Sequence, residues 1–160
     1  MNIIAIDPGT TESAVVRWKD GIIHMAVIVP NHQCLAAVRS QTATALIAVE
    51  MVACYGMAVG KEVFETCLMV GRIQEAAYMN CLAGVECRLI YRQQVKLHHC
   101  QSARAKDGNV RQALIDKYGA PGTKKAQGRT YGLKSHLWSA FAIATFVSET
   151  TTSSAPEKEL

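Results

Sequence analysis

The chain has 160 residues, of which 49% are hydrophobic and 19% are charged, and its formal net charge is +4 at pH 7. These values are typical of one folded, soluble domain with a sizeable core. The chain starts without a basic leader and contains no apolar run of roughly 18 residues, so we expect neither a signal peptide nor a membrane span.

The first thirty residues predict three strands joined by tight turns. Residues 2–6 form a short apolar run of β-forming side chains, which is typical of a buried strand. Residues 13–18 and 22–29 have the same character, and the pair Asp20-Gly21 between them favours a hairpin turn. The three strands together predict an antiparallel meander.

The middle of the chain predicts a helix, a strand and a longer helix. Asn31 can cap a helix over residues 31–40. Residues 45–50, with the sequence ALIAVE, read as a buried strand, and residues 51–60 form a loop that contains glycine. Apolar side chains then recur at helical spacing over residues 61–80, which predicts a long helix.

The last third predicts one strand and three helices. Residues 85–91 form the fifth predicted strand. Helices are expected over residues 93–99, 107–118 and 135–147, with a basic, glycine-rich loop at residues 122–133 before the last of them.

This order of elements predicts an α/β fold. A strand that is followed by a helix and a second strand of the same sheet requires a parallel, right-handed crossover. We therefore expect a mixed five-stranded sheet, with its first three strands antiparallel, flanked by helices. A single domain should span residues 1–150, with Ser135 capping the last helix and residues 151–160 as a disordered tail.

Two of the predicted strands end in a carboxylate, Asp7 in the first and Glu50 in the fourth. If these strands are parallel neighbours, both carboxylates emerge at one edge of the sheet. Their mutual repulsion can be relieved by divalent cations, and paired carboxylates of this kind support metal-assisted phosphoryl transfer. The alternative is a pair of unrelated acids at strand ends.

Three segments in order carry a resemblance to a known family. IIAIDPGT at the start, ALIAVE ending at Glu50, and HLWSA at residues 136–140 resemble the motifs of the RuvC-like branch of the RNase H superfamily. The resemblance covers roughly residues 2–146. It implies an RNase H-like fold and an endonuclease, dependent on Mg²⁺ or Mn²⁺, that resolves Holliday junctions or related branched DNA in recombination and repair. It also implies a homodimer.

Residues 96–133 look more like the phage members of this branch, which implies a phage-type resolvase. Such a protein acts in the cytoplasm of a bacterial host. The cysteines agree with a reducing compartment, because they contain no Cys-x-x-Cys pair and read as free thiols. They are Cys34, Cys54, Cys67, Cys81, Cys87 and Cys100.

The resemblance implies that Asp7, Glu50 and His136 are catalytic and bind the metal. The last motif departs from the family pattern Asp-x-x-Asp-Ala, because His136 replaces the first aspartate and Ser139 the second. A neutral imidazole can bind a divalent ion or move a proton, whereas serine cannot replace a carboxylate's charge. Asp107 is the candidate for the missing catalytic acid, and its alternative role is to cap the helix that follows it.

Positive charge is concentrated in one third of the chain. Residues 86–138 contain eleven Lys or Arg and three Asp or Glu, a local balance of +8, so the rest of the chain sums to −4. Such asymmetry favours a polyanionic partner on one face over a solvated basic surface. The candidate phosphate contacts are Arg104, Lys106, Arg111, Lys124, Lys125, Arg129 and Lys134.

Other interpretations stay open from the sequence. Ser139 motivates a noncatalytic module that binds branched DNA with the same fold. The stretch IAIDPGTTES also resembles the first phosphate loop of sugar kinases and Hsp70-like ATPases, although those folds need two such lobes. The helix at residues 61–80 carries apolar side chains on more than one face, so it is either the dimer interface or simply core.

Overall fold

The structure is a computed structural model, and it describes residues 1–41, 44–54, 56–80, 82 and 84–153. Most of the predicted element bounds are confirmed to within two residues. The elements in chain order are β1 (Asn2–Pro8), β2 (Glu12–Lys19), β3 (Ile22–Pro30), α1 (Asn31–Arg39), β4 (Ala45–Met51), α2 (Lys61–Tyr78), β5 (Val85–Tyr91), α3 (Arg92–Cys100), α4 (Asp107–Tyr118) and α5 (Leu137–Ser153).

The strands form one mixed sheet in the order β3-β2-β1-β4-β5. β1, β2 and β3 pair antiparallel, while β1 with β4 and β4 with β5 pair parallel. The predicted five-stranded sheet with an antiparallel first half is therefore confirmed. The parallel half brings the carboxyl ends of β1, β4 and β5 to one edge, which we call the strand-end rim.

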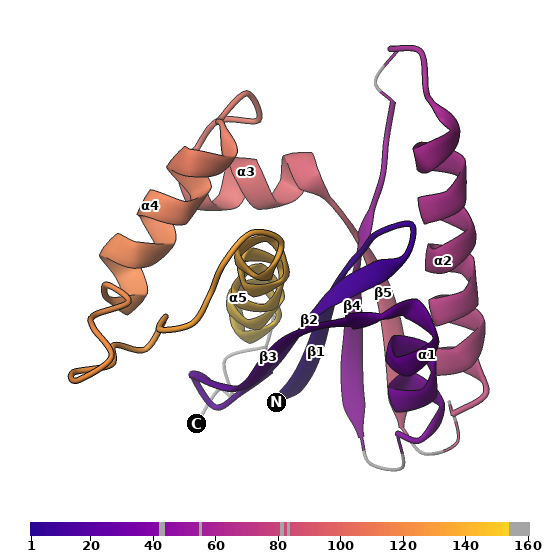
Figure 1. Cartoon of the computed structure of the whole chain (residues 1–160), viewed down its shortest axis with the longest axis horizontal. Coiled ribbons are helices and arrows are strands. Elements are labelled where there is room, and N and C mark those ends of the chain that lie inside the picture. The colour runs from indigo at the N-terminus through magenta and orange to yellow at the C-terminus, as the bar shows by residue number, and fades with distance from the viewer. Residues whose placement is uncertain (42–43, 55, 81, 83, 154–160) are drawn as a thin grey trace, which may run out of the picture.

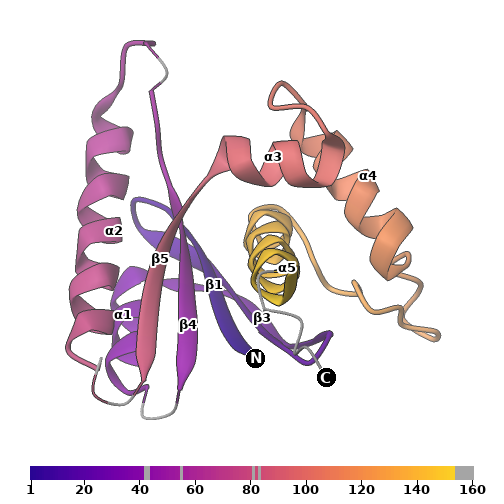
Figure 2. The same ribbon diagram turned by 180° about the vertical axis from the view of Figure 1, so that it is seen from behind.

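Helices cover both faces of the sheet. α1 and α2 lie on one face, and α5 lies on the other with α3 and α4 packed beyond it (Figures 1 and 2). Alternation along β1 divides its side chains between two cores: Ile3 and Ala5 are buried with α5, whereas Ile4 and Ile6 are buried with α1 and α2. Alternate residues of β1 and of β4 thus face opposite sides of the sheet, so the position of a residue along its strand tells which side its side chain faces.

An aromatic cluster fixes α4 and α5 against β2. The ring centroids of Trp18 and Tyr118 are 5.5 Å apart, and Phe141 lies 5.5 Å from Trp18 and 5.4 Å from Tyr118. Tilted and edge-on contacts of this kind add specific geometry to the apolar burial. The cluster holds the start of α5 in a defined place over the sheet.

The last helix begins and ends later than the sequence predicts. It begins at Leu137, so His136 rather than Ser135 precedes it, and it continues to Ser153. Three contacts stabilise its polar end: Glu149 pairs with α3 and α4, Thr150 donates to the carbonyl of Phe146, and Arg88 donates to Thr151. The predicted disordered tail is therefore wrong for residues 151–153, and the rest of it lies outside the described residues.

The cysteines that the structure describes are free thiols, as expected, and Cys81 lies outside the described residues. Burial raises the pKa of the Cys34 thiol to about 11, despite a hydrogen bond with Ser13. Among the described helices, none combines the length and apolarity needed to cross a bilayer.

Candidate active site

Two carboxylates meet at the strand-end rim because strand register and parity both place them there. Ile6 pairs with Val49, so Asp7 and Glu50 are the next residues along two adjacent parallel strands. Asp7 shares parity with Ile3 and Ala5, and Glu50 shares parity with Leu46 and Ala48, all of which face α5. Both carboxylates therefore emerge at one edge of the sheet, as expected for parallel neighbouring strands, and the structure shows in addition that both point toward the start of α5.

The two carboxylates are largely buried, with 13% of the Asp7 side chain and 12% of the Glu50 side chain exposed. Burial is the main factor that raises the pKa of Glu50 to about 7, and the charge of Asp7 and a hydrogen bond between the two groups raise it further. Arg92 opposes these effects without cancelling them. A pair of carboxyls in this state favours binding of a cation.

His136 joins the site from the turn before α5. Its Nδ1 lies 3.0 Å from Asp7 Oδ2, and 70% of its side chain is exposed. The structure thus brings together the three residues for which the family motifs imply a metal or catalytic role. The imidazole is the member of this group that incoming molecules reach most easily.

The turn after Asp7 depends on Gly9. The Gly9 N–H donates to the Glu12 carbonyl at 3.0 Å, and a Cβ on Gly9 would stand 2.6 Å from that same oxygen. Any larger residue would push β1 and β2 apart at this point. The Pro-Gly pair therefore closes the turn that positions the carboxylate.

Asn31 braces the same turn instead of capping α1. Pro30 is the residue before the helix, and the structure shows no side-chain cap there. The Asn31 side chain donates to the carbonyls of Gly9 and Thr10 at 3.0 and 3.1 Å, and it accepts from the Ser13 hydroxyl at 2.7 Å. The predicted cap is wrong because Asn31 is the first residue of α1 rather than the residue before it, and its Oδ1, the atom that would cap the helix, accepts from Ser13 instead.

Arg92 is a site residue that the sequence analysis missed. It follows β5 directly, and its Nη1 donates to Glu50 Oε1 and Oε2 at 3.1 and 3.3 Å and to Ser139 Oγ at 2.9 Å. The signal was present in the sequence, because Arg92 is the charged residue at the end of the third parallel strand. Pairing β5 with β4 gives it the same rim as Glu50.

Asp107 reaches this site through Arg92. It is the first residue of α4, after Lys106 in the cap position, and its Oδ1 lies 2.8 Å from Arg92 Nη2 and 3.6 Å from Lys96 Nζ. Partial burial works to raise the pKa of Asp107, but the hydrogen bond and charge of Arg92 outweigh it and lower the pKa. The structure brings Asp107 to the guanidinium rather than to the carboxylate pair.

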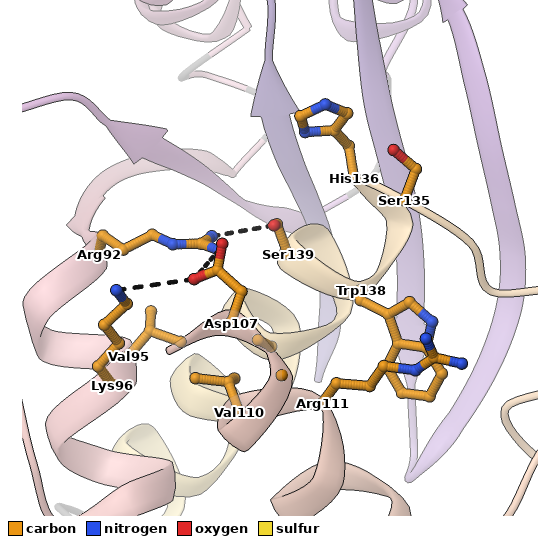
Figure 3. A pocket seen from close by; sticks show the side chains of 12 residues that line it. Arg92, Val95, Lys96, Asp107, Val110, Arg111, Ser135, His136, Trp138 and Ser139 are labelled. Carbon is orange, nitrogen blue, oxygen red and sulfur yellow. Dashed lines mark hydrogen bonds and ion pairs between the residues drawn. The ribbon is translucent and has the colours of Figure 1, made fainter. Parts of the chain in front are cut away.

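A cavity of about 370 Å³ opens beside the rim between α3, α4 and α5. Arg92, Lys96 and Asp107 line one side of it, as Figure 3 shows. Arg111 and Trp138 line another side, with the guanidinium stacked 4.9 Å from the indole ring centre. The cavity therefore combines fixed positive charge with an aromatic ring next to His136.

All seven predicted phosphate contacts are exposed, and α4 separates five of them into two groups. Arg104 and Lys106 lie before α4, at its site end. Lys124, Lys125 and Arg129 lie after α4, roughly 18 Å away along a helix of twelve residues. Arg111 lines the cavity, and Lys134 precedes His136 by two residues.

The donor set fits a divalent ion that completes its coordination with water or substrate. Within the described part of the chain, no group of three or more His, Cys, Asp or Glu side chains is arranged to hold a metal ion. Two desolvated carboxylates in contact nevertheless suit Mg²⁺ or Mn²⁺, because such ions are often held by one or two carboxylates plus phosphate oxygens. Asp7 and Glu50 would hold the ion, with His136 beside them.

Comparisons with known proteins identify the fold. No family model matches the chain, and no curated protein matches it. Among solved structures, Thermus thermophilus RuvC matches at 20% identity and a TM-score of 0.62, over 95% of this chain and 98% of that chain. T. thermophilus RuvC in complex with Holliday junction substrate matches at 17% identity and a TM-score of 0.64, over 95% and 97%. The chain therefore has a RuvC-like fold.

Proposed function

We propose that this protein is a Mg²⁺- or Mn²⁺-dependent endonuclease that resolves Holliday junctions or related branched DNA. The observation that carries the proposal is the contact of Asp7 with Glu50 at the strand-end rim, facing His136. The exposed cations around this rim and the likeness to RuvC, including RuvC in complex with Holliday junction substrate, support the same conclusion. An ATP-binding lobe has no comparable support.

Each residue of the site has a definite task in this proposal. The divalent ion, when bound, supplies positive charge that polarises the scissile phosphate. Asp7 and Glu50 hold that ion. In the tautomer that carries its proton on Nδ1, His136 donates a hydrogen bond to Asp7, which leaves Nε2 on the far side of the ring free to accept a proton.

The exposed cations hold the DNA in this proposal. Arg104 and Lys106 lie at the site end of α4, where they can reach phosphates near the cleaved bond. Lys124, Lys125 and Arg129 lie a helix length away, so they suit a second arm of a junction. Contacts to phosphate fix orientation without reading sequence, as a structure-selective nuclease requires.

We further propose a homodimer that forms through α2. One face of this helix is buried against the sheet by Val70, Ile73 and other residues. The opposite face exposes Phe64 and Leu68, 61% and 70% accessible, which are four residues apart and therefore lie on one stripe. Cutting a symmetric junction on two strands requires two sites, and therefore two copies of the chain. The exposed apolar stripe is the surface that we propose for their contact.

The finer assignments follow from the resemblance of residues 96–133 to phage members. We propose that the protein is phage-type and acts in the cytoplasm of a bacterial host. Its role would then be to remove junctions that recombination or replication leaves in the DNA.

A cleavage assay tests the proposed function. Purified protein is incubated with four-way, flap and linear duplex DNA, with Mg²⁺, with Mn²⁺ and with a chelator. We expect metal-dependent cutting of the branched substrates, and we expect Asp7→Asn to cut at least about 10³-fold more slowly while binding the junction normally. Binding without cutting in either metal would support the noncatalytic module that Ser139 suggests, and absence of binding to branched DNA would overturn both.

A further inference from the structure

We propose that the guanidinium of Arg92 takes the place of a second cation in this site, so that each chain binds one divalent ion and Arg92 supplies the second positive charge to the scissile phosphate. The inference rests on the proposed nuclease function and specifies how the site works. It is drawn from the contacts of Arg92, the neutral side chain of Ser139 and the charge balance of the site.

Arg92 is held at a fixed point of the rim by oxygens from three elements. Glu50 on β4 accepts through both carboxylate oxygens, Ser139 on α5 accepts through Oγ, and Asp107 on α4 accepts through Oδ1. The distances from the guanidinium nitrogens to these oxygens run from 2.8 to 3.3 Å. A ring of oxygens from separate elements is the environment that a bound cation normally has.

Ser139 explains why an arginine suits this place better than a metal ion. Its hydroxyl brings no negative charge, and it lies 2.9 Å from Arg92 Nη1. A second divalent ion would have to share Glu50 with the guanidinium and would gain no carboxylate from α5. An arginine carries its own charge on a covalent tether, so it needs fewer anionic ligands to remain there.

The formal charges around the rim lead to the same conclusion. Asp7, Glu50 and Asp107 bring three negative charges, and Arg92 and Lys96 bring two positive charges, which leaves −1. One divalent ion and one phosphodiester bring this balance to zero. A second divalent ion would leave an excess of +2 within contact distance of a guanidinium, which is unfavourable in a partly buried site.

Arg92 can also reach the substrate. It lines the cavity beside the rim, and a guanidinium has five N–H donors, so some remain for a phosphate oxygen in addition to the protein contacts. Asp107 acts as a positioning residue in this arrangement, since it anchors Nη2 while Nη1 faces Glu50 and Ser139. Figure 3 shows Arg92 between Ser139 and Asp107 at the edge of the cavity.

The experiment counts bound ions. Mn²⁺ is titrated into the protein, alone and with a four-way junction, and free Mn²⁺ is measured by electron paramagnetic resonance. We expect one ion per chain in the wild type and in Arg92→Ala, and two in the double variant Arg92→Ala/Ser139→Asp. Arg88→Ala is the matched control, because Arg88 pairs with Glu86 on the same strand away from the rim, and it should bind one ion.

Cleavage kinetics accompany the count. Arg92→Ala should cut the junction about 10³-fold more slowly, as expected when an arginine that stabilises transition-state charge is removed. Two ions per wild-type chain would overturn the inference and leave the proposed nuclease standing. No bound Mn²⁺ under either condition, together with no cleavage, would overturn the proposed function itself. The number of Mn²⁺ ions bound per wild-type chain can overturn the inference even if a variant fails to fold.

Discussion

The strand-end rim has two halves, one around Asp7 at the end of β1 and one around Glu50 at the end of β4. Both begin with a largely buried carboxylate, but the carboxylates have different partners. On the β1 side, Asp7 meets His136, whose imidazole is largely exposed. On the β4 side, Glu50 meets Arg92, which also holds Ser139 and Asp107. The first half exposes an imidazole beside its largely buried carboxylate, while the second pairs its equally buried carboxylate with a guanidinium.

The difference teaches that a strand end only delivers a carboxylate, and its neighbours decide how it is used. Burial raises the pKa of Glu50 to about 7 even though Arg92 lies within hydrogen-bonding distance. The ion pair is thus weaker than the combined effect of desolvation and the charge of Asp7. A buried ion pair is weak evidence for stability. We therefore expect the Glu50–Arg92 pair to add less to the free energy of unfolding than its short distances suggest.

The largest effect is expected from removing the charge of Glu50. Its pKa rises from 4.5 to about 7 on folding, so the folded state binds the proton more tightly and loses stability as pH rises across that range. Without metal, Glu50→Gln should therefore raise the free energy of unfolding by about 3 kcal/mol at pH 8 and by little near pH 4. Urea unfolding in a chelator measures this difference.

Asp107→Asn provides the contrasting control. The pKa of Asp107 is lowered by Arg92, so its contribution to stability is present at neutral pH and disappears in acid. Loss of its charge should therefore destabilise the protein slightly at pH 8, the opposite sign to Glu50→Gln. If Glu50→Gln raised the free energy of unfolding equally at pH 8 and near pH 4, the gain would not come from the buried charge of Glu50.

The next effect compares His136, in the turn before α5, with Ser139 on α5. His136→Ala should slow junction cleavage about 10²-fold, because a group positioned to transfer protons typically contributes that much. Ser139→Ala should cost about tenfold or less, since Arg92 keeps its bonds to Glu50 and Asp107. Single-turnover cleavage at saturating metal measures both. Equal losses would erase the proposed difference between the halves.

The sequence predicts the sheet and its carboxylates because local signals specify both. Apolar runs bounded by turn residues mark each strand, and the helix between β4 and β5 forces their parallel pairing. That Asp7 and Glu50 share the face covered by α5 depends in addition on the register of β1 with β4 and on the packing of α5, which the structure supplies. His136 was reached only through the family motif, since nothing local distinguishes it from a surface histidine.

The remaining site features depend on contacts that no local pattern records. Arg92 carries a local signal as the charged residue after a strand, but its place beside Glu50 follows only when β5 is paired with β4. From the sequence, Asp107 is either a catalytic acid or a helix cap, and only the packing of α3 against α4 shows that it pairs with Arg92. The helical end at Ser153 likewise depends on contacts with α3, α4 and β5. In each case tertiary packing chooses between roles that the sequence leaves open.

A further small effect should come from Asn31, which braces the turn after Asp7. Asn31→Ala removes the side-chain bonds to Gly9, Thr10 and Ser13, which should lower the free energy of unfolding by about 1–2 kcal/mol. Because those bonds fix the turn that positions Asp7, cleavage by the folded variant should also slow by about tenfold. Thermal unfolding and single-turnover cleavage measure the two effects.

Asn80→Ala separates bracing of the site from general stability. Asn80 also donates to two consecutive carbonyls, those of Val38 and Arg39 at the end of α1, at 3.0 and 3.1 Å. It follows α2 and lies at the end of the sheet away from the rim. It should lose similar stability and keep its cleavage rate. If both variants lost cleavage equally, the loss would come from reduced stability and not from the turn. Asp7 would then be held in place by β1 and Gly9 without help from Asn31.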